Sequence, residues 1–411
     1  MNDAAQLTIA LAVMAFAAAS GRLHHKPLSA AMAFVAVGFV LGTDGLGWLD
    51  SVTASSLTAV TNITLVLVLF SDASQLDVGL LRREWSVPAR LLGIGLPLTI
   101  AAGLIAGVVL LPGIAVAEAL VLAVILAPTD AALGAAVVTD ERLPSRLRQG
   151  LNAESGLNDG ICVPLLAVAL AVADVEAGAE AEPVLTALVK EVGWGLVAGV
   201  AAGLLATLVL RVAGRGGGIS PVWRPLVTVA GAAIAYTLAI EIHGSGFIAA
   251  FVGGLTFRLA YGDDALEEVE LLEVGSSLLA AVTFLLFGGV ILGPMLHDLS
   301  WRVVLYALAS LTVVRMIPVA LSLIGSRLGK ASVLLLGWFG PRGLASIVFG
   351  LIVVDSADLP HTHLLMQVVT ITIAISVLLH GITAVPLVDR FVARHPTPSS
   401  PDVAAAGERS G

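Results

Sequence analysis

Charge and cysteine are both scarce in this chain of 411 residues. Only 12% of the residues are Asp, Glu, Lys or Arg, and Cys162 is the single cysteine, which excludes an intrachain disulfide. No block of basic residues is present, so the composition gives no reason to expect nucleic acid as a partner. Hydrophobic residues make up 58% of the chain instead. These values exclude a water-soluble protein and predict an all-α polytopic protein in the lipid bilayer.

Apolar runs, broken by glycine, proline and charged clusters, predict about thirteen transmembrane helices. They begin near residues 4, 28, 57, 88, 116, 146, 184, 222, 244, 270, 300, 331 and 363. Lys and Arg gather in alternate loops, which marks those loops as cytoplasmic. We therefore expect an inner (plasma) membrane protein with its N-terminus outside and its C-terminus in the cytoplasm. The tail 396–411, rich in Pro, Ser and Ala, is expected to be disordered.

The helix starts repeat along the chain. Adding about 213 residues to the starts of the first six predicted helices gives positions close to the starts of helices eight to thirteen. An odd number of crossings separates the two sets, so they form two inverted repeats of about six helices, as is typical of secondary transporters. The alternative explanation is that a chain of helical hairpins of similar length shows this spacing by chance. Matched helix breaks favour a true repeat, because the offset places Pro128 on Pro341.

Both prolines lie inside predicted helices, the fifth and the twelfth. Pro128 is followed by Thr129 and Asp130, and Pro341 is followed by Arg342. Proline removes a backbone hydrogen bond and displaces another, so both helices should be discontinuous and cross near the midplane. Their free ends offer carbonyl groups to a cation and amide groups to a carboxylate. Arg342 is expected to compensate the carbonyl ends of its own break.

The sixth predicted helix carries two carboxylates at membrane depth, Glu154 and Asp159. A turn of about 100° per residue places Ser155 and Asp159 on one face and directs Glu154 away from it. An unpaired carboxylate there would be protonated, so Glu154 needs a basic partner. Arg315 and Arg342 are the bases within predicted helices. We expect a structural ion pair with Arg315, and Arg342 is the alternative.

Three motifs together carry a family resemblance. They are Ala127-Pro128-Thr129-Asp130-Ala131-Ala132-Leu133, Glu154-Ser155-Gly156-Leu157-Asn158-Asp159-Gly160 and Gly340-Pro341-Arg342-Gly343. In this order they resemble the fifth, sixth and twelfth helices of NhaP-type antiporters in the monovalent cation:proton antiporter-1 family, which is related to animal sodium/proton exchangers. The resemblance covers residues 4–393.

This resemblance implies a homodimer that serves pH homeostasis by elevator-type alternating access. It implies a mobile ion-carrying core, about residues 88–174 and 300–393, and a dimerisation scaffold, about residues 1–73 and 184–293. It also implies electroneutral exchange, because Asn158 and Asp159 stand where electrogenic relatives carry two aspartates.

One position departs from the family pattern. Family members often carry a glutamate directly after the phenylalanine of the third helix, whereas this chain reads Phe70-Ser71-Asp72. A shift of one residue turns the acid by about 100° around the helix. Asp72 is therefore either a peripheral part of the ion site or a solvated residue near the cytoplasmic mouth.

The expected mechanism is competition for one carboxylate. Burial of Asp159 favours its protonated form, and a small hard cation prefers oxygen ligands. Asp159, Ser155, the Thr129 carbonyl and Asp130 through water would supply them, while Asn158 would be a neutral spacer toward Thr129 or Asp130. Crossing with either ion bound moves one charge each way, because an empty carboxylate is too costly in the apolar barrier.

Other classes explain less of the sequence. An intramembrane aspartyl protease leaves Glu154, Arg315 and Arg342 unexplained, and Asp159 lacks the Gly-x-Gly-Asp context of such enzymes. A sodium-coupled symporter or a cation channel of related fold remains the alternative. No cofactor is expected. Sodium is the favoured cation, and selection against lithium and potassium depends on ångström-scale geometry that the sequence does not give.

Overall fold

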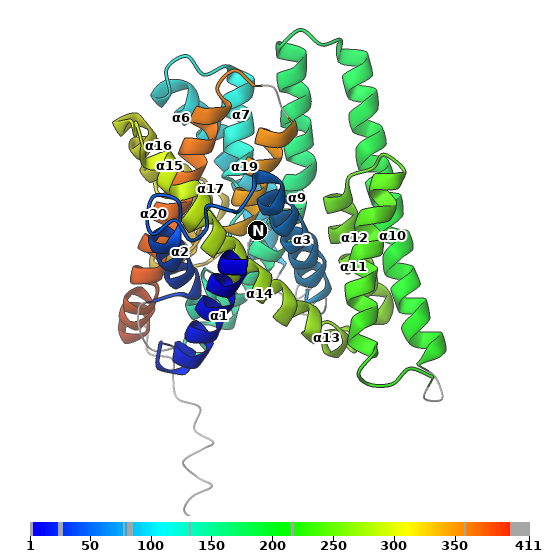
Figure 1. The fold of residues 1–411 in the computed structure, drawn as a ribbon. Helices are drawn as coiled ribbons and strands as arrows, with labels where there is room; N and C mark the ends of the chain where they lie inside the picture. Colours follow the sequence, from blue (N-terminus) through cyan, green and yellow to red (C-terminus); the bar gives the residue numbers. More distant parts are fainter. Residues whose placement is uncertain are drawn as a thin grey trace, which may run out of the picture.

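The computed structural model describes residues 3–23, 28–76, 79, 85–130, 133–214, 218–356 and 359–394. Within these residues all regular structure is helical, as Figure 1 shows. The tail 396–411 lies outside the described residues.

The first part of the chain supplies six helical runs and a seventh that is broken. They are α1 (Asp3–Leu23), α2 (Ala30–Leu41), α3 (Ala54–Ser74), the run of α5 (Ser86–Arg90), η1 (Leu91–Gly95) and α6 (Leu96–Leu110), the broken helix of α7 (Val116–Ile125) and α8 (Ala135–Val138), α9 (Ser145–Glu176) and α10 (Ala181–Ala213).

The second part supplies five more runs and a second broken helix. They are α11 (Arg224–Glu241), α12 (Gly246–Tyr261), the short α13 (Ala265–Glu268) with the run of α14 (Glu270–Leu286), η3 (Phe287–Leu292) and α15 (Gly293–Leu296), the pair α16 (Trp301–Leu311) and α17 (Val313–Ser322), the broken helix of α18 (Lys330–Trp338) and α19 (Leu344–Ser356), and α20 (Thr362–Arg394).

Among the described residues this gives thirteen membrane-crossing units, when each broken helix counts once and α13 is left out. Eight helices or continuous runs are long and apolar enough to span a membrane, and the apolar α2, α7, α12 and α19 are shorter. The predicted all-α architecture of about thirteen helices is confirmed. The short members include α7 and α19, each one half of a broken helix.

Both predicted helix breaks are present, and they touch. α7 ends at Ile125 before Pro128, and α18 ends at Trp338 before Pro341, because neither proline can continue the helical hydrogen bonding. The Asp130 amide donates to the Pro341 carbonyl at 2.8 Å, which joins the two extended segments directly. The discontinuous helices therefore cross each other, as the inverted repeat predicts.

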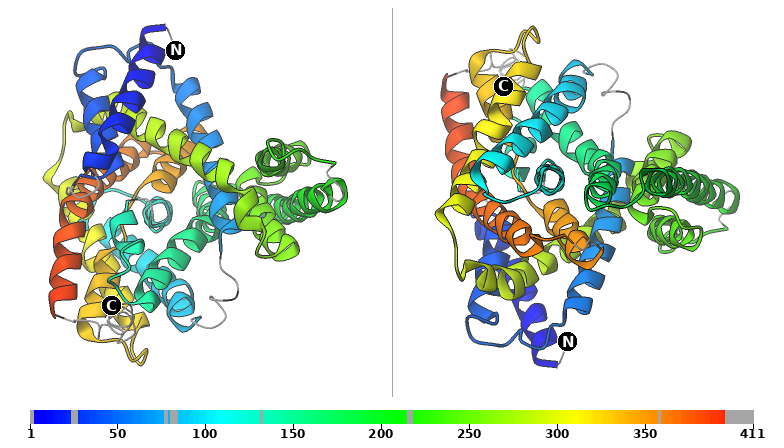
Figure 2. Two further views of the ribbon diagram at one scale, coloured as in Figure 1. Left: turned by 90° about the horizontal axis from the view of Figure 1, so that it is seen from below. Right: turned by 90° about the horizontal axis from the view of Figure 1, so that it is seen from above.

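The helices pack in two groups. α10, α11 and α12 pack on one another and form a lobe that projects from the rest of the molecule in Figure 2. α12 also packs on α3, and α11 packs on α14. In the other group, α6 packs on α7 and α7 packs on α9, and α16 and α19 pack with α20. Contacts between α9 and the helices α3, α10 and α12 connect the groups.

Glycines set the close approach of α12 to its neighbours. A Cβ atom on Gly203 of α10 would overlap the Gly253 backbone, and one on Gly254 would overlap the backbone of Phe70 in α3. Small residues are how helices approach closely in lipid, where apolar burial gives no advantage between helices. α12 is thereby held firmly against α3 and α10.

Candidate functional site

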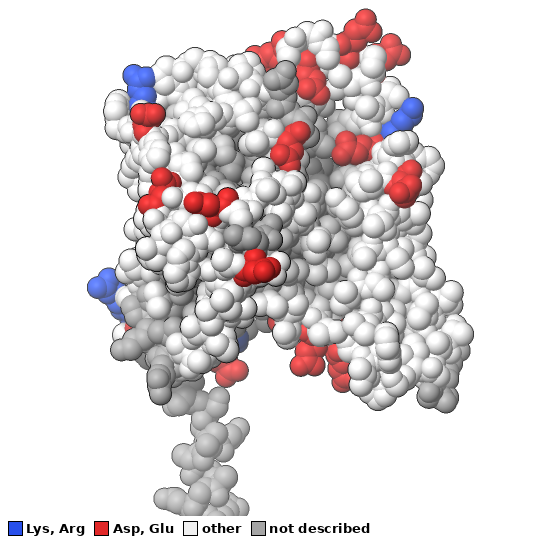
Figure 3. Space-filling model, in the orientation of Figure 1, with Lys and Arg blue, Asp and Glu red and all other residues white. Residues whose placement is uncertain are grey.

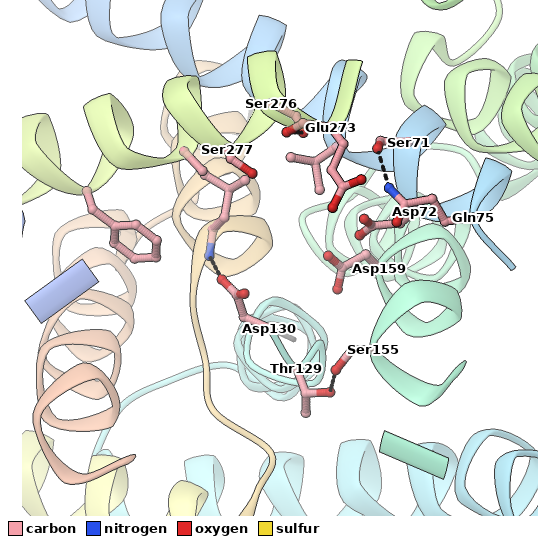
Figure 4. A pocket seen from close by; sticks show the side chains of 14 residues that line it. Ser71, Asp72, Gln75, Thr129, Asp130, Ser155, Asp159, Glu273, Ser276 and Ser277 are labelled. Atoms are coloured by element: carbon pink, nitrogen blue, oxygen red, sulfur yellow. Dashed lines mark hydrogen bonds between the residues drawn. The ribbon is translucent and has the colours of Figure 1, made fainter. Parts of the chain in front are cut away.

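A cavity of about 190 Å³ lies where α3, the first helix break, α9 and α14 meet. Figure 4 shows its polar side chains converging from these elements. Its lining includes four carboxylates, Asp72, Asp130, Asp159 and Glu273, and the polar residues Ser71, Gln75, Thr129, Ser155, Ser276 and Ser277. So many oxygen atoms in one cavity suit a cation or a proton better than an apolar ligand.

Asp159 is the most deeply placed acid in this cavity. It is 7% exposed and lies in the middle of α9, with its carboxylate turned toward Asp72 in Figure 4. Its Oδ1 accepts no hydrogen bond from the described side chains or backbone. A buried carboxylate oxygen without a donor is costly, so a proton or a cation bound there would stabilise the site.

A hydroxyl cluster lies beside Asp159. Ser155, one turn earlier on α9, is on the same face and also lines the cavity, as the helix wheel predicted. Its Oγ lies 3.0 Å from Oγ1 of Thr129, and the Asn158 side-chain amide donates to that Thr129 oxygen at 2.7 Å. Asn158 is 1% exposed and is not part of the cavity wall. The amide therefore holds the first break against α9.

Asp130 belongs to the first break but stabilises the second. Its Oδ2 accepts from the Leu344 amide at 3.0 Å, and its Oδ1 accepts from the Leu133 amide at 3.3 Å. Leu344 is the first residue of α19, so the carboxylate lies at a helix N-terminus, where the aligned dipoles favour a negative charge. A Cβ atom on Gly343 would overlap this carboxylate, so glycine makes room for it.

Arg342 makes the reverse connection. Its side chain is fully buried, and its guanidinium donates to the Ala127 carbonyl and, at 3.0 Å, to the Pro128 carbonyl. Both carbonyls follow α7 in the first break, so the expectation that Arg342 compensates its own break is wrong. The crossing brings the electronegative end of α7 within reach of Arg342, whose own backbone amide donates to Ser376 Oγ at 2.7 Å.

Glu154 faces away from the cavity and pairs with Arg315. The contacts are bidentate, at 2.6 Å from Nη1 to Oε1 and 2.8 Å from Nη2 to Oε2, and each side chain is 3% exposed. The pair connects α9 to α17. A Cβ atom on Gly340 would overlap the Arg315 guanidinium, so the second break leaves the space that this pair fills.

Asp72 and Glu273 complete the acidic lining. Asp72 is half-buried on α3 and faces Asp159 in Figure 4, so the structure places it at the cavity. Sequence reasoning missed Glu273, in the first turn of α14. A sequence pattern could have identified it, because Ser276 and Ser277 follow three and four residues later and form a polar stripe with it on a largely apolar helix.

The buried ion pair gives a direct test of the fold around the site. Glu154→Gln leaves the Arg315 charge without its counter-ion, which should destabilise the protein by about 3–5 kcal/mol. Thermal unfolding in detergent measures the effect. The double substitution Glu154→Leu with Arg315→Met removes both charges and should recover most of the lost stability. Equal stability of Glu154→Gln and the unsubstituted protein would contradict the structural role.

Comparisons with known proteins agree with this architecture. A family model described as "Sodium/hydrogen exchanger, transmembrane" matches residues 9–390. Similar curated proteins include the K(+)/H(+) antiporter NhaP of Alkalimonas amylolytica, 26% identical over 90% of this chain and 64% of that protein. Another is the K(+)/H(+) antiporter NhaP2 of Shewanella oneidensis, 25% identical over 85% of this chain and 60% of that protein. The chain thus spans less than two thirds of these relatives.

Solved structures share the fold. The sodium proton antiporter MjNhaP1 from Methanocaldococcus jannaschii superimposes with a TM-score of 0.74 at 21% identity, over 94% of this chain and 97% of that one. The family model covers nearly the whole chain, and the structural match extends over the same helices. The chain therefore belongs to the sodium/hydrogen exchanger family of transmembrane proteins.

Proposed function

We propose that this protein is a secondary transporter that exchanges a monovalent cation for a proton, one for one, with both ions competing for Asp159. The observation that carries the proposal is the buried Asp159 carboxylate, which faces a polar cavity at the crossing of two broken helices. The family supports it, since its similar members are named K(+)/H(+) and Na(+)/H(+) antiporters.

The cation site would use hard oxygen ligands. The Asp159 carboxylate, Ser155 Oγ and an oxygen of Thr129 are the cavity atoms that suit sodium, and Asp130 would contribute through water. Asp72 lies at the wall as a peripheral acid. We propose sodium as the main cation. Lithium and potassium differ from it in size and hydration, so they are the comparison ions for the assay.

The charge arrangement supports electroneutral exchange. The charge on Asp130 is compensated by the N-terminus of α19, and the charge on Glu154 is compensated by Arg315. Asn158 is uncharged and is held by Thr129. If Asp72 and Glu273 at the cavity wall keep one charge state throughout the cycle, Asp159 is the acid whose charge changes, and a sodium ion and a proton would each cross with a neutral site.

The two packing groups support movement of one against the other. We propose that α5–α9 and α16–α20 form the mobile core, and that α1–α3 and α10–α14 form a scaffold through which two copies of the chain pair. The two helix breaks and the Glu154–Arg315 pair lie inside the proposed core, so the ion site would move as one body. The proposed setting is the plasma membrane, with the N-terminus outside.

The carrier assignment is tested by Asp159→Asn. Sodium-driven proton movement in proteoliposomes, followed by dequenching of a pH-sensitive dye, should fall to the level of empty liposomes. Folding should survive, because a neutral amide is cheaper to bury than a carboxylate. Asp264→Asn, an exposed loop substitution, is the matched control and should exchange normally. Native-rate exchange by Asp159→Asn would show that another group carries the ion.

Competition has its own kinetic signature. If proton and sodium share Asp159, a fall of one pH unit should raise the apparent KM for sodium by up to about tenfold and leave the maximal rate unchanged. Initial rates measured across sodium concentrations at several pH values decide this. A loss of rate at low pH that saturating sodium does not overcome would argue for separate proton and cation sites.

Stoichiometry is tested with membrane voltage. Sodium/proton exchange should proceed at the same rate, and reach the same end point, with and without a potassium-valinomycin clamp, because no net charge moves. A voltage-dependent end point would reject one-for-one exchange. Conductance without saturation would indicate a channel, and a requirement for an organic co-substrate would indicate a symporter.

A further inference from the structure

A second cavity lies along the same helix as Asp159. It has a volume of about 440 Å³, and the six residues that α9 contributes to its wall include Val163, Leu166, Leu170 and Asp174. At about 100° per residue, these four residues and Asp159 fall within roughly 80° of one another around α9. One face of α9 therefore runs from the polar cavity at Asp159 into the second cavity.

An aromatic ring packs on α9 at a level between the two cavities. Phe251 of α12 packs directly on Gly160, the residue that follows Asp159, and a Cβ atom on Gly160 would overlap that ring. Phe247, one turn earlier on α12, already lines the second cavity. The ring is held in place because α12 packs closely on α10 and α3.

α9 carries a second glycine one turn before Gly160. Gly156 lies about 40° from Gly160 around the helix and about 6 Å before it along the axis. A Cβ atom on Gly156 would lie 3.8 Å from Leu76 Cδ2 and 3.9 Å from Asp72 Cβ, which is ordinary contact. The packing seen here therefore gives no reason for glycine at position 156.

A shift of α9 along its axis would explain why residue 156 is a glycine. If α9 moved by four residues in the direction of its C-terminal end, Gly156 would replace Gly160 beneath the Phe251 ring. The same step would carry Asp159 past the ring to the level that Val163 now occupies, inside the second cavity. One-turn steps of a helix past a fixed neighbour are a known form of conformational change.

We propose that Phe251 is the fixed barrier of the transport cycle, and that α9 has two positions against it, with Gly160 under the ring in one and Gly156 in the other. Asp159 then opens to the polar cavity in the first position and to the second cavity in the second position. This inference rests on the proposed exchange function, and it assigns residues to the step that moves the ion.

The second cavity is suited to a cation at its outer end. Asp174 and Glu191 line it, and both are exposed. Figure 3 shows acidic side chains gathered at the top of the molecule, the end at which α9 and α10 join. Glu176, Glu180 and Glu182 add to the negative charge of this connection. Such a field attracts cations to the mouth.

Gly156→Ala tests the two-position mechanism. The added methyl group fits the arrangement seen here but would overlap Phe251 in the shifted one, so the sodium/proton exchange rate should fall by about tenfold or more. Sodium binding should persist, measured as the rise in thermal unfolding temperature that sodium gives the unsubstituted protein. Adding Phe251→Leu to Gly156→Ala should restore sodium-dependent, saturable exchange, because the smaller apolar side chain leaves room for the added methyl group and still closes the path between the cavities.

Gly193→Ala on α10 is the matched control, since a Cβ atom there meets nothing within 4 Å, and it should exchange normally. Native-rate exchange by Gly156→Ala would overturn the proposal. So would loss of sodium stabilisation together with transport, failure to fold, or failure of Phe251→Leu to restore exchange. Absence of exchange in the unsubstituted protein is a different result, which would reject the proposed function itself.

Discussion

The crossing of the two broken helices depends on reciprocal contacts, in which a charged side chain of each break binds the backbone of the other. Asp130 of the first break accepts from the N-terminal amide of α19, and Arg342 of the second break donates to the carbonyls that follow α7. Each charge therefore meets a helix end of opposite sign. Without these reciprocal contacts, the unpaired backbone groups of both breaks would be buried in an apolar bundle at a cost of several kcal/mol. The polar cavity exists because the breaks can be stable there.

The charges of the interior fall into two kinds. Asp130, Arg342, Glu154 and Arg315 each meet a charge or a helix end of opposite sign within the protein. Asp159 has none for its Oδ1 among the described groups, although it is nearly as buried. The first kind shapes the bundle. The second kind is open to a partner from outside the protein, and the ion proposed above would be a partner of that sort.

Much of this arrangement could be predicted from local sequence. Pro128 and Pro341 locate the breaks because proline acts on its own helix, and the helical period places Ser155 with Asp159. The choice of Arg315 for Glu154 followed because so few bases lie within helices. What could not be predicted depends on how separate helices approach. Arg342 contacts the opposite break because the two breaks cross. The sequence around Arg342 does not show which other segment will lie across it.

The positions of Glu273 and Asp72, on the other side of the cavity, also depend on how separate helices pack. Both lie near helix ends, where acidic residues are common, and their position opposite Asp159 follows from the packing of α14 on α3 and of α3 on α9. Sequence period gives the face of a helix, but the neighbour that this face meets is a property of the assembled bundle.

The depth of the Glu154–Arg315 pair has a consequence for the conditions the protein can work in. Dissolved ions screen charges at a surface over about 8 Å at physiological ionic strength, but they screen a buried pair much less. With each side chain 3% exposed, this pair keeps its strength whatever the salt concentration on either side of the membrane. The helices that hold the site can thus face large swings in salinity without losing this connection between them.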